Sequence, residues 1–243
     1  MLKLKKNIGL IIAVLISLII FEAGWIGFDA ADQRDVASSF IWLLSNGTYG
    51  FNGVFFAILA ALPLSTSYVR EYKSGYLSIV FTKQTKKKYI LGKLVHNGLY
   101  GGIALAVPAI IINIELLLHY GPDAHIDKET TVIMFLKDWA VGRELVYVLL
   151  LIGIIFSCGV IFSTLALGIS AWVKNSFLTL IIPFGLCILT AMFPPRKLNL
   201  LLLYSPNVYG HMSIPLTCVM GILLFVAGIV MFVTGVHYNE KNK

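Results

Sequence analysis

The chain has 243 residues, of which 58% are hydrophobic and 13% charged, and its formal net charge at pH 7 is +7. A soluble domain of this size carries about 25% charged residues, so the composition excludes an ordinary soluble fold and predicts an all-α membrane protein. The apolar residues form long runs with little between them, and we therefore expect one transmembrane domain over residues 1–243.

Six apolar runs follow one another along the chain. A helix that crosses a bilayer needs about 20 such residues. We therefore predict a polytopic protein with six transmembrane helices. The first run follows three lysines, as in a signal peptide, but it is too long for one and no small-residue cleavage site follows, so we expect an uncleaved helix. The runs are Ile8–Phe28, Phe51–Val69, Leu94–Glu115, Leu145–Trp172, Ser176–Phe193 and Ser213–Val236.

Glu22 is the one acidic residue inside a predicted span. If that helix ends near Gly27, the carboxyl lies roughly 7 Å below its outer end. An acid within the membrane is a candidate ion-binding or coupling site. Alternatively, Glu22 reaches the headgroups or pairs with a neighbouring helix.

The segment between the second and third runs mixes basic, aromatic and aliphatic residues with a single acid. A connector that only had to stay in water would not need these apolar residues. We predict a helix over Glu71–Phe81 that lies on the membrane surface and docks on a soluble partner, the alternative being a plain positively charged connector. The residues assigned to this coupling role are Glu71, Tyr72, Lys73, Gly75, Tyr76 and Phe81. A basic cluster at the membrane surface is predicted at Lys83, Lys86, Lys87, Lys88 and Lys93.

The outer connections are expected to carry structure of their own. Residues 29–50 turn from acidic to apolar, residues 118–143 contain the spacing of a short interfacial helix ending near Trp139, and Leu198–Tyr204 is too short to span. The histidines and aspartates of the second connection have loose spacing, so we predict no metal site. Proline interrupts three spans and predicts bends there.

The last run repeats glycine every seven residues, at Gly221, Gly228 and Gly235. Two helical turns stack these glycines on one face. Because small residues let helix backbones approach closely, this face is predicted to pack on another helix.

The charge distribution predicts the orientation. If the N-terminus is cytoplasmic, thirteen of the 19 lysines and arginines fall on the cytoplasmic side, where only two acids accompany them. This bias predicts that both termini are cytoplasmic. The positive charge then implies contact with membrane lipid, and no nucleic-acid partner is predicted.

The sequence contains no phosphate-binding GxxxxGK[ST] loop and no ladder of charged residues across the spans. We therefore predict that the chain is not an enzyme and carries no cofactor. Two alternatives stay open beside a motor-driven transporter: an ion-coupled secondary transporter, and a membrane immunity protein that does not transport.

The six-run layout and the basic segment resemble the ABC-2 type permeases, the membrane subunits of ATP-binding-cassette exporters. The resemblance is sharpest at Glu71-x-x-x-Gly75, at the Thr82–Lys88 stretch and at Gly92-Lys93, although Gln84-Thr85 replaces the proline usual in that family. It implies a coupling helix that docks on a separate ATPase subunit, where ATP and Mg²⁺ bind. It also implies a second permease chain, identical or related, and a bacterial cell membrane. The small size is similar to compact exporters of peptide toxins or bacteriocins.

Overall fold

The computed structural model describes residues 8–26, 36–49, 51–121, 137–192, 199–203 and 214–241, and every regular element within them is helical. The predicted all-α class is therefore confirmed. The elements are α2 (Ile8–Ile26), α3 (Val36–Tyr49), α4 (Phe51–Ala61), α5 (Ser67–Lys73), α6 (Tyr76–Lys83), α7 (Lys86–Tyr120), α8 (Lys137–Ala140), α9 (Glu144–Val173), α10 (Ser176–Met192), the 3₁₀ helix η2 (Leu200–Leu203) and α11 (Ile214–Lys241).

Three helices of the described residues are long and apolar enough to cross a membrane: α7, α9 and α11. They contain 35, 30 and 28 residues. Helices α2 and α10 are apolar but shorter, with 19 and 17 residues. These lengths support a membrane protein, whereas only three of the six predicted spans are full-length helices.

The second predicted span, Phe51–Val69, is not one helix. Helix α4 ends at Ala61, a turn covers residues 62–66, and α5 begins at Ser67. Pro63 explains the break, because proline has no N–H to donate and its ring clashes with the preceding helical turn. With 11 residues, α4 is about 16 Å long and cannot cross a bilayer alone.

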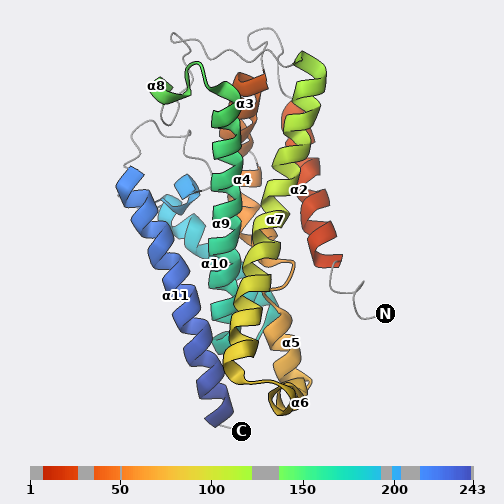
Figure 1. Cartoon of the computed structure of the whole chain (residues 1–243), viewed down its shortest axis with the longest axis vertical. Helices are drawn as coiled ribbons and strands as arrows, with labels where there is room; N and C mark the ends of the chain where they lie inside the picture. Colours follow the sequence, from red (N-terminus) through yellow and green to blue (C-terminus); the bar gives the residue numbers. More distant parts are fainter. Residues whose placement is uncertain are drawn as a thin grey trace.

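Helix α9 is the centre of the molecule and packs against α7, α11, α4 and α10 (Figure 1). It approaches α7 closely where Gly101 faces Gly159. A Cβ added at Gly101 would lie 2.7 Å from the carbonyl oxygen of Gly159. Two helices can approach this closely only where both lack side chains.

The glycine face of α11 lies on the opposite flank of α9. A Cβ at Gly228 would be 2.8 Å from the backbone nitrogen of Leu165, and one at Gly235 would be 3.0 Å from the Trp172 indole nitrogen. Gly221 is less tightly packed, with its nearest neighbour, Ile161, at 3.2 Å. The predicted packing face of α11 therefore meets α9 along its length.

The main core is an apolar cluster formed by α3, α4, α7 and α9, with contributions from α2, α10 and η2. Helix α3 belongs to this core and is not a surface segment of an outer connection. Its buried side chains are Val36, Ala37, Ser39, Phe40, Ile41, Leu43 and Leu44.

The interfacial helix predicted within residues 118–143 is described only in part. Helix α7 continues to Tyr120, and α8 covers Lys137–Ala140. The other apolar residues of that prediction, Val132, Phe135 and Leu136, lie outside the described residues, as does the possible metal cluster beyond His119. In the last connection, Leu200 and Leu203 of η2 are buried in the main core.

Candidate functional site: the basic end

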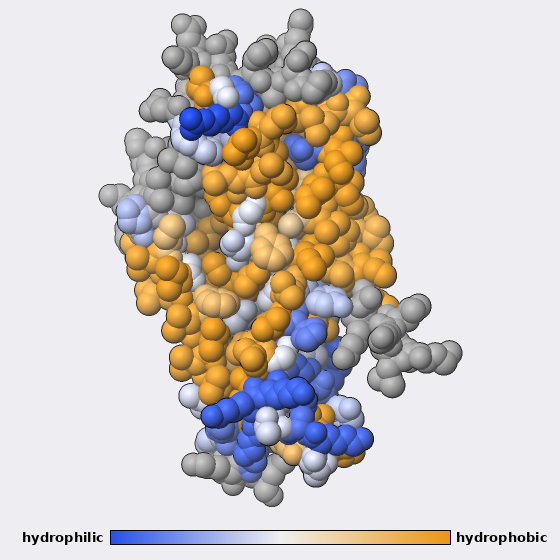
Figure 2. Space-filling model, viewed as in Figure 1, coloured by the Kyte–Doolittle hydropathy of each residue, from blue (hydrophilic) through white to orange (hydrophobic). Residues whose placement is uncertain are grey.

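Helices α5 and α6, the first turns of α7 and the end of α11 gather at one end of the molecule (Figure 1). We call this the basic end, because the lysines of the predicted basic cluster lie there. Figure 2 shows hydrophilic side chains concentrated at this end, below a broad apolar surface. It contains every residue assigned to coupling from the sequence.

The predicted coupling segment is a helical hairpin and not the single helix expected over Glu71–Phe81. Helix α5 stops at Lys73, and Gly75 adopts a left-handed conformation with φ +69° before α6 begins. A residue with a side chain rarely adopts this conformation, so glycine defines the break. The turn is closed by hydrogen bonds from the Ser74 N–H to the Arg70 carbonyl (3.0 Å) and from the Ser78 hydroxyl to the Gly75 carbonyl (2.6 Å).

A second apolar cluster holds this hairpin against the long helices. It is separate from the main core and joins α5 and α6 to α7, α9 and α11, so we call it the basic-end core. Its buried members are Tyr68, Leu77, Val80, Tyr89, Ile90, Leu167, Ala171, Phe232 and Val236. The apolar residues of the coupling segment, which were assigned to a partner contact from the sequence, are therefore partly explained by packing within this chain.

Glu71 is bound within the chain. Its carboxylate accepts hydrogen bonds from the Lys93 ammonium (2.7 Å) and from the Tyr89 hydroxyl (2.8 Å). The same ammonium also donates to the Ser67 hydroxyl at 2.9 Å. This half-buried ion pair connects α5 to the first turns of α7 and fixes the orientation of the hairpin.

Two of the predicted coupling aromatics also have contacts inside the molecule. The Tyr72 ring lies 4.6 Å from the Lys174 ammonium, which donates a hydrogen bond to the Tyr72 hydroxyl at 3.2 Å. The Phe81 ring contacts the Tyr89 ring edge-on, with centroids 5.4 Å apart. Both side chains therefore help to hold the hairpin in place.

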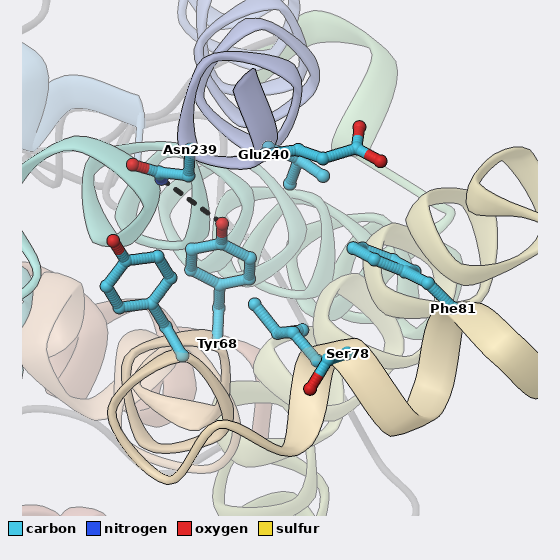
Figure 3. Close-up of a pocket in the computed structure, with 8 residues that line it drawn as sticks. Tyr68, Ser78, Phe81, Asn239 and Glu240 are labelled. Carbon is cyan, nitrogen blue, oxygen red and sulfur yellow. Dashed lines mark hydrogen bonds between the residues drawn. The ribbon is translucent and has the colours of Figure 1, made fainter. Parts of the chain in front are cut away.

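A groove of about 230 Å³ separates the hairpin from the end of α11 (Figure 3). At its base the Asn239 amide donates to the Tyr68 hydroxyl (3.2 Å) and to the Ala171 carbonyl (2.6 Å). Asn239 was not predicted from the sequence, because a single amide near the end of a long helix has no distinguishing pattern. The lining residues are Tyr68, Tyr72, Leu77, Ser78, Phe81, Val236, Asn239 and Glu240.

The outward face of the hairpin is formed by the remaining coupling residues. Lys73 and Gly75 are exposed at the turn, and the Tyr76 side chain is 49% exposed. Ile79, one turn further along α6, is exposed to a similar extent. An exposed aromatic side chain is the type of residue that most often anchors a protein interface, and Tyr76 is therefore the candidate anchor of this face.

The predicted basic cluster divides into two groups. Lys93 pairs with Glu71, and Lys86 pairs with Glu240 at the end of α11. Lys83, Lys87 and Lys88 are exposed, and no carboxylate partner is found for them among the described residues.

Three buried polar residues that are hydrogen-bonded to one another lie next to the break at Pro63, and we call them the polar joint. The Ser163 carbonyl of α9 accepts hydrogen bonds from the Asn97 amide (2.6 Å) and from the Ser65 hydroxyl (3.1 Å). All three residues are buried. Asn97 was not predicted from the sequence, since one amide in an apolar run is as compatible with a lipid-facing turn as with a contact between helices.

Glu22 lies far from the basic end and lines a small pocket of about 70 Å³ with Glu115 and His119 of α7. The pocket therefore brings the carboxyls of two different helices to one site. Both glutamates are solvent- or lipid-accessible in the chain. Pairing with a neighbouring helix was one of the alternatives predicted for Glu22, but the sequence did not identify Glu115, which is 93 positions away.

Comparisons with known proteins identify no relative of the chain. No protein-family model matches it, and no match was found among curated proteins or solved structures. The resemblance of the basic segment to ABC-2 permeases therefore stays a prediction.

Proposed function

We propose that the chain is the membrane permease of an ATP-driven exporter of the ABC-2 type, with the α5–α6 hairpin as its contact to a separate ATPase subunit. The observation that carries this proposal is the hairpin itself. It is fixed at the basic end of three long apolar helices by an ion pair and its own apolar core, and it keeps Tyr76 on its outward face.

This anchoring matters mechanically. A motor subunit can drive a membrane domain only if the segment that it contacts transmits the movement to the long helices. A contact segment that bent by itself would absorb that movement. The Glu71–Lys93 pair joins the hairpin to α7, and Tyr72 joins it to Lys174 at the end of α9. A displacement of the hairpin would therefore be passed directly to the helix pair that packs at Gly101 and Gly159.

In this proposal six segments cross a bacterial cell membrane: α2, the predicted second span Phe51–Val69, α7, α9, α10 and α11. Both termini are cytoplasmic, and two permease chains and two ATPases form the working unit. The exported substrate is amphipathic or apolar, with peptide toxins or antimicrobial peptides as the first class to test, because the long helices have few charged side chains in their apolar stretches. ATP and Mg²⁺ would bind on the partner.

The docking contact is tested with Tyr76→Ala. Aromatic anchors commonly contribute about 2 kcal/mol or more to an interface, so this variant should lose most of the ATP hydrolysis that copurifies with the tagged chain from native membranes. Tyr238→Ala is the matched control, since Tyr238 is an aromatic of similar exposure on α11 rather than on the hairpin. Equal retention of ATPase activity by the two variants and the wild type would refute docking through the hairpin.

Glu71 has a different part in the same proposal. Because its carboxylate is already bound to Lys93 and Tyr89, it acts as a positioning residue. Glu71→Ala should release the hairpin, so that substrate no longer stimulates ATP hydrolysis even where some ATPase stays bound. Accelerated amide exchange in α5 and α6 would distinguish this loss of anchoring from the loss of a direct contact.

The orientation is tested by labelling single cysteines. A cysteine at Lys87 should react only from the cytoplasmic side, and one at His125 only from outside. Reaction of the Lys87 position with an impermeant reagent in intact cells would reverse the topology and remove the hairpin from any cytoplasmic ATPase.

An ion-coupled transporter is the second candidate, and the pocket shared by Glu22 and Glu115 favours it. Two carboxyls that line one pocket could take up and release a proton during transport. If they drive transport, Glu22→Gln should abolish it at every pH without loss of folding. The exporter proposal predicts only a modest decrease. A third possibility, an immunity protein that does not transport, predicts function when ATP hydrolysis is blocked.

A further inference from the structure

One outward face of α7 combines exposed lysines with an exposed apolar ladder. Lys87 and Lys88 lie in the first turn, and Leu91, Val95 and Leu99 follow at intervals of four residues. Residues three or four apart are neighbours on a helix surface. The exposed fractions of these three apolar side chains are 64%, 48% and 48%, so no other part of the described chain covers them.

Within the described residues, the lysines of this face differ from the neighbouring lysines in having no ion pair. Lys86 and Lys93, on either side of it in sequence, pair with Glu240 and Glu71. Lys87 and Lys88 are exposed and have no carboxylate partner among the described residues. Their charges also add to the positive N-terminal end of α7, which is electrostatically unfavourable unless an anion is near.

Gly92 leaves a notch in the middle of this face. A Cβ added there would have no neighbour within 4 Å. Gly92 is one helical turn beyond Lys88 and follows Leu91, so the notch lies beside the start of the apolar ladder and next to the cationic turn. The Gly92 carbonyl lies 2.7 Å from His96 Nδ1, but the space above its Cα is open, and a bulky polar group can approach there without steric conflict.

We propose that this face of α7 binds one anionic phospholipid. Its phosphate contacts Lys87 and Lys88, its glycerol and ester region lies over Gly92, and an acyl chain follows Leu91, Val95 and Leu99. Lysine side chains of a helix point toward its N-terminus, which moves the two ammonium groups away from the ladder toward the headgroup level. Cationic and apolar groups thus follow one another in the order that a phospholipid requires.

Charge argues against the other occupants of the same face. A second copy of the chain packed through α7 about a twofold axis would bring Lys87 and Lys88 toward the same lysines, which repel. An acidic protein surface would satisfy the lysines but would not cover a ladder of three exposed apolar side chains. A free phosphate would leave that ladder equally uncovered.

The test measures binding of phosphatidylglycerol and of phosphatidylcholine with identical acyl chains to the purified full chain in neutral detergent, by native mass spectrometry. One lysine near an anionic headgroup contributes roughly fivefold in affinity, so Lys87→Gln with Lys88→Gln should weaken phosphatidylglycerol binding about 30-fold. Phosphatidylcholine binding should be unchanged. The charge-matched control is Lys73→Gln with Lys83→Gln, two exposed lysines of the hairpin, for which we expect less than about a twofold change.

Gly92→Leu is a second, independent test, because the open space around Gly92 lets the helix accept a side chain. It should weaken phosphatidylglycerol binding by filling the notch while the charge stays constant. Glycerol phosphate, the headgroup without acyl chains, should not compete. The proposal is overturned if the two lipids bind equally, if the control pair loses as much affinity, if Gly92→Leu binds normally, or if glycerol phosphate or an acidic peptide displaces the lipid.

Discussion

The main core and the basic-end core are held together in different ways. In the main core, α3, α4, α7 and α9 meet through apolar side chains with few polar groups among them. The basic-end core is smaller and is crossed by polar contacts between distant residues, such as Asn239 with Tyr68 and Lys93 with Glu71. Along α9 the buried polar joint at Ser163 lies between Phe162 of the main core and Leu167 of the basic-end core.

The difference has a mechanical consequence. Close apolar packing around glycine tolerates almost no change of distance, because a shift of less than an ångström either creates a clash or opens a void. Polar contacts at an accessible end can be broken and replaced by water at modest cost. We therefore expect the long helices to move as a rigid unit, and single substitutions to have smaller and more local effects at the basic end than in the main core.

The largest expected effect is that of Gly228→Leu on the packing of α9 and α11. The added side chain would meet the Leu165 backbone, which cannot move aside as a flexible side chain would. Overpacking of this kind costs about 1–3 kcal/mol or more, so the variant should show a lower melting temperature and poor recovery in size-exclusion chromatography. Gly153→Leu is the control, since no atom lies within 4 Å of a Cβ there. Similar behaviour of both variants would show that the close approach of α11 to α9 is not needed for stability.

Asn97→Leu should have the next largest effect, since it breaks the polar joint between the two cores. Hydrogen bonds between membrane helices contribute about 0.6 kcal/mol on average and up to about 1.7 kcal/mol, and this amide is only 2% exposed. We expect a loss near the upper value, measured by unfolding in a denaturing detergent. Ser157→Ala, which removes an exposed hydroxyl bonded only within α9, should be close to neutral. An unchanged Asn97→Leu variant would mean that the two cores are joined by apolar packing alone.

Tyr68→Phe removes one hydroxyl from the basic-end core and should act locally. Asn239 loses one acceptor but keeps the Ala171 carbonyl, so we expect a cost of about 0.5–1.5 kcal/mol. Amide exchange should accelerate in the last turns of α11 and in α5, with little change in α3 or α4. Equal acceleration throughout the chain would contradict the separation of the two cores.

The smallest effect is expected for the ion pair between Lys86 and Glu240. Both side chains are more than a third exposed, and such pairs contribute about 0.2–1 kcal/mol. A double-mutant cycle with Lys86→Gln and Glu240→Gln measures the coupling free energy and its decrease with added salt. A coupling above about 2 kcal/mol, beyond the range of exposed pairs, would show that this pair holds α11 to the start of α7 as firmly as buried contacts do.

The sequence by itself determined the helical class, the approximate position of the long helices and the glycine face of α11. These features depend on local composition and on residue spacing along one helix, which a single segment expresses completely. It also located the basic segment between the second and third runs. It did not reveal that Gly75 would divide that segment, although glycine is the residue that most readily adopts a left-handed turn.

Only the tertiary structure decided which charged and polar groups meet. Glu71 is bonded to Lys93, 22 positions away, Tyr72 to Lys174, and Asn239 to Tyr68 across 171 positions. The lysines of the basic segment look alike in sequence, yet Lys86 and Lys93 are paired while Lys87 and Lys88 face outward. The burial of α3 was decided in the same way, because its apolar residues suit a membrane surface as well as a core. Partner choice depends on how separate helices pack, and no periodicity within one segment carries that information.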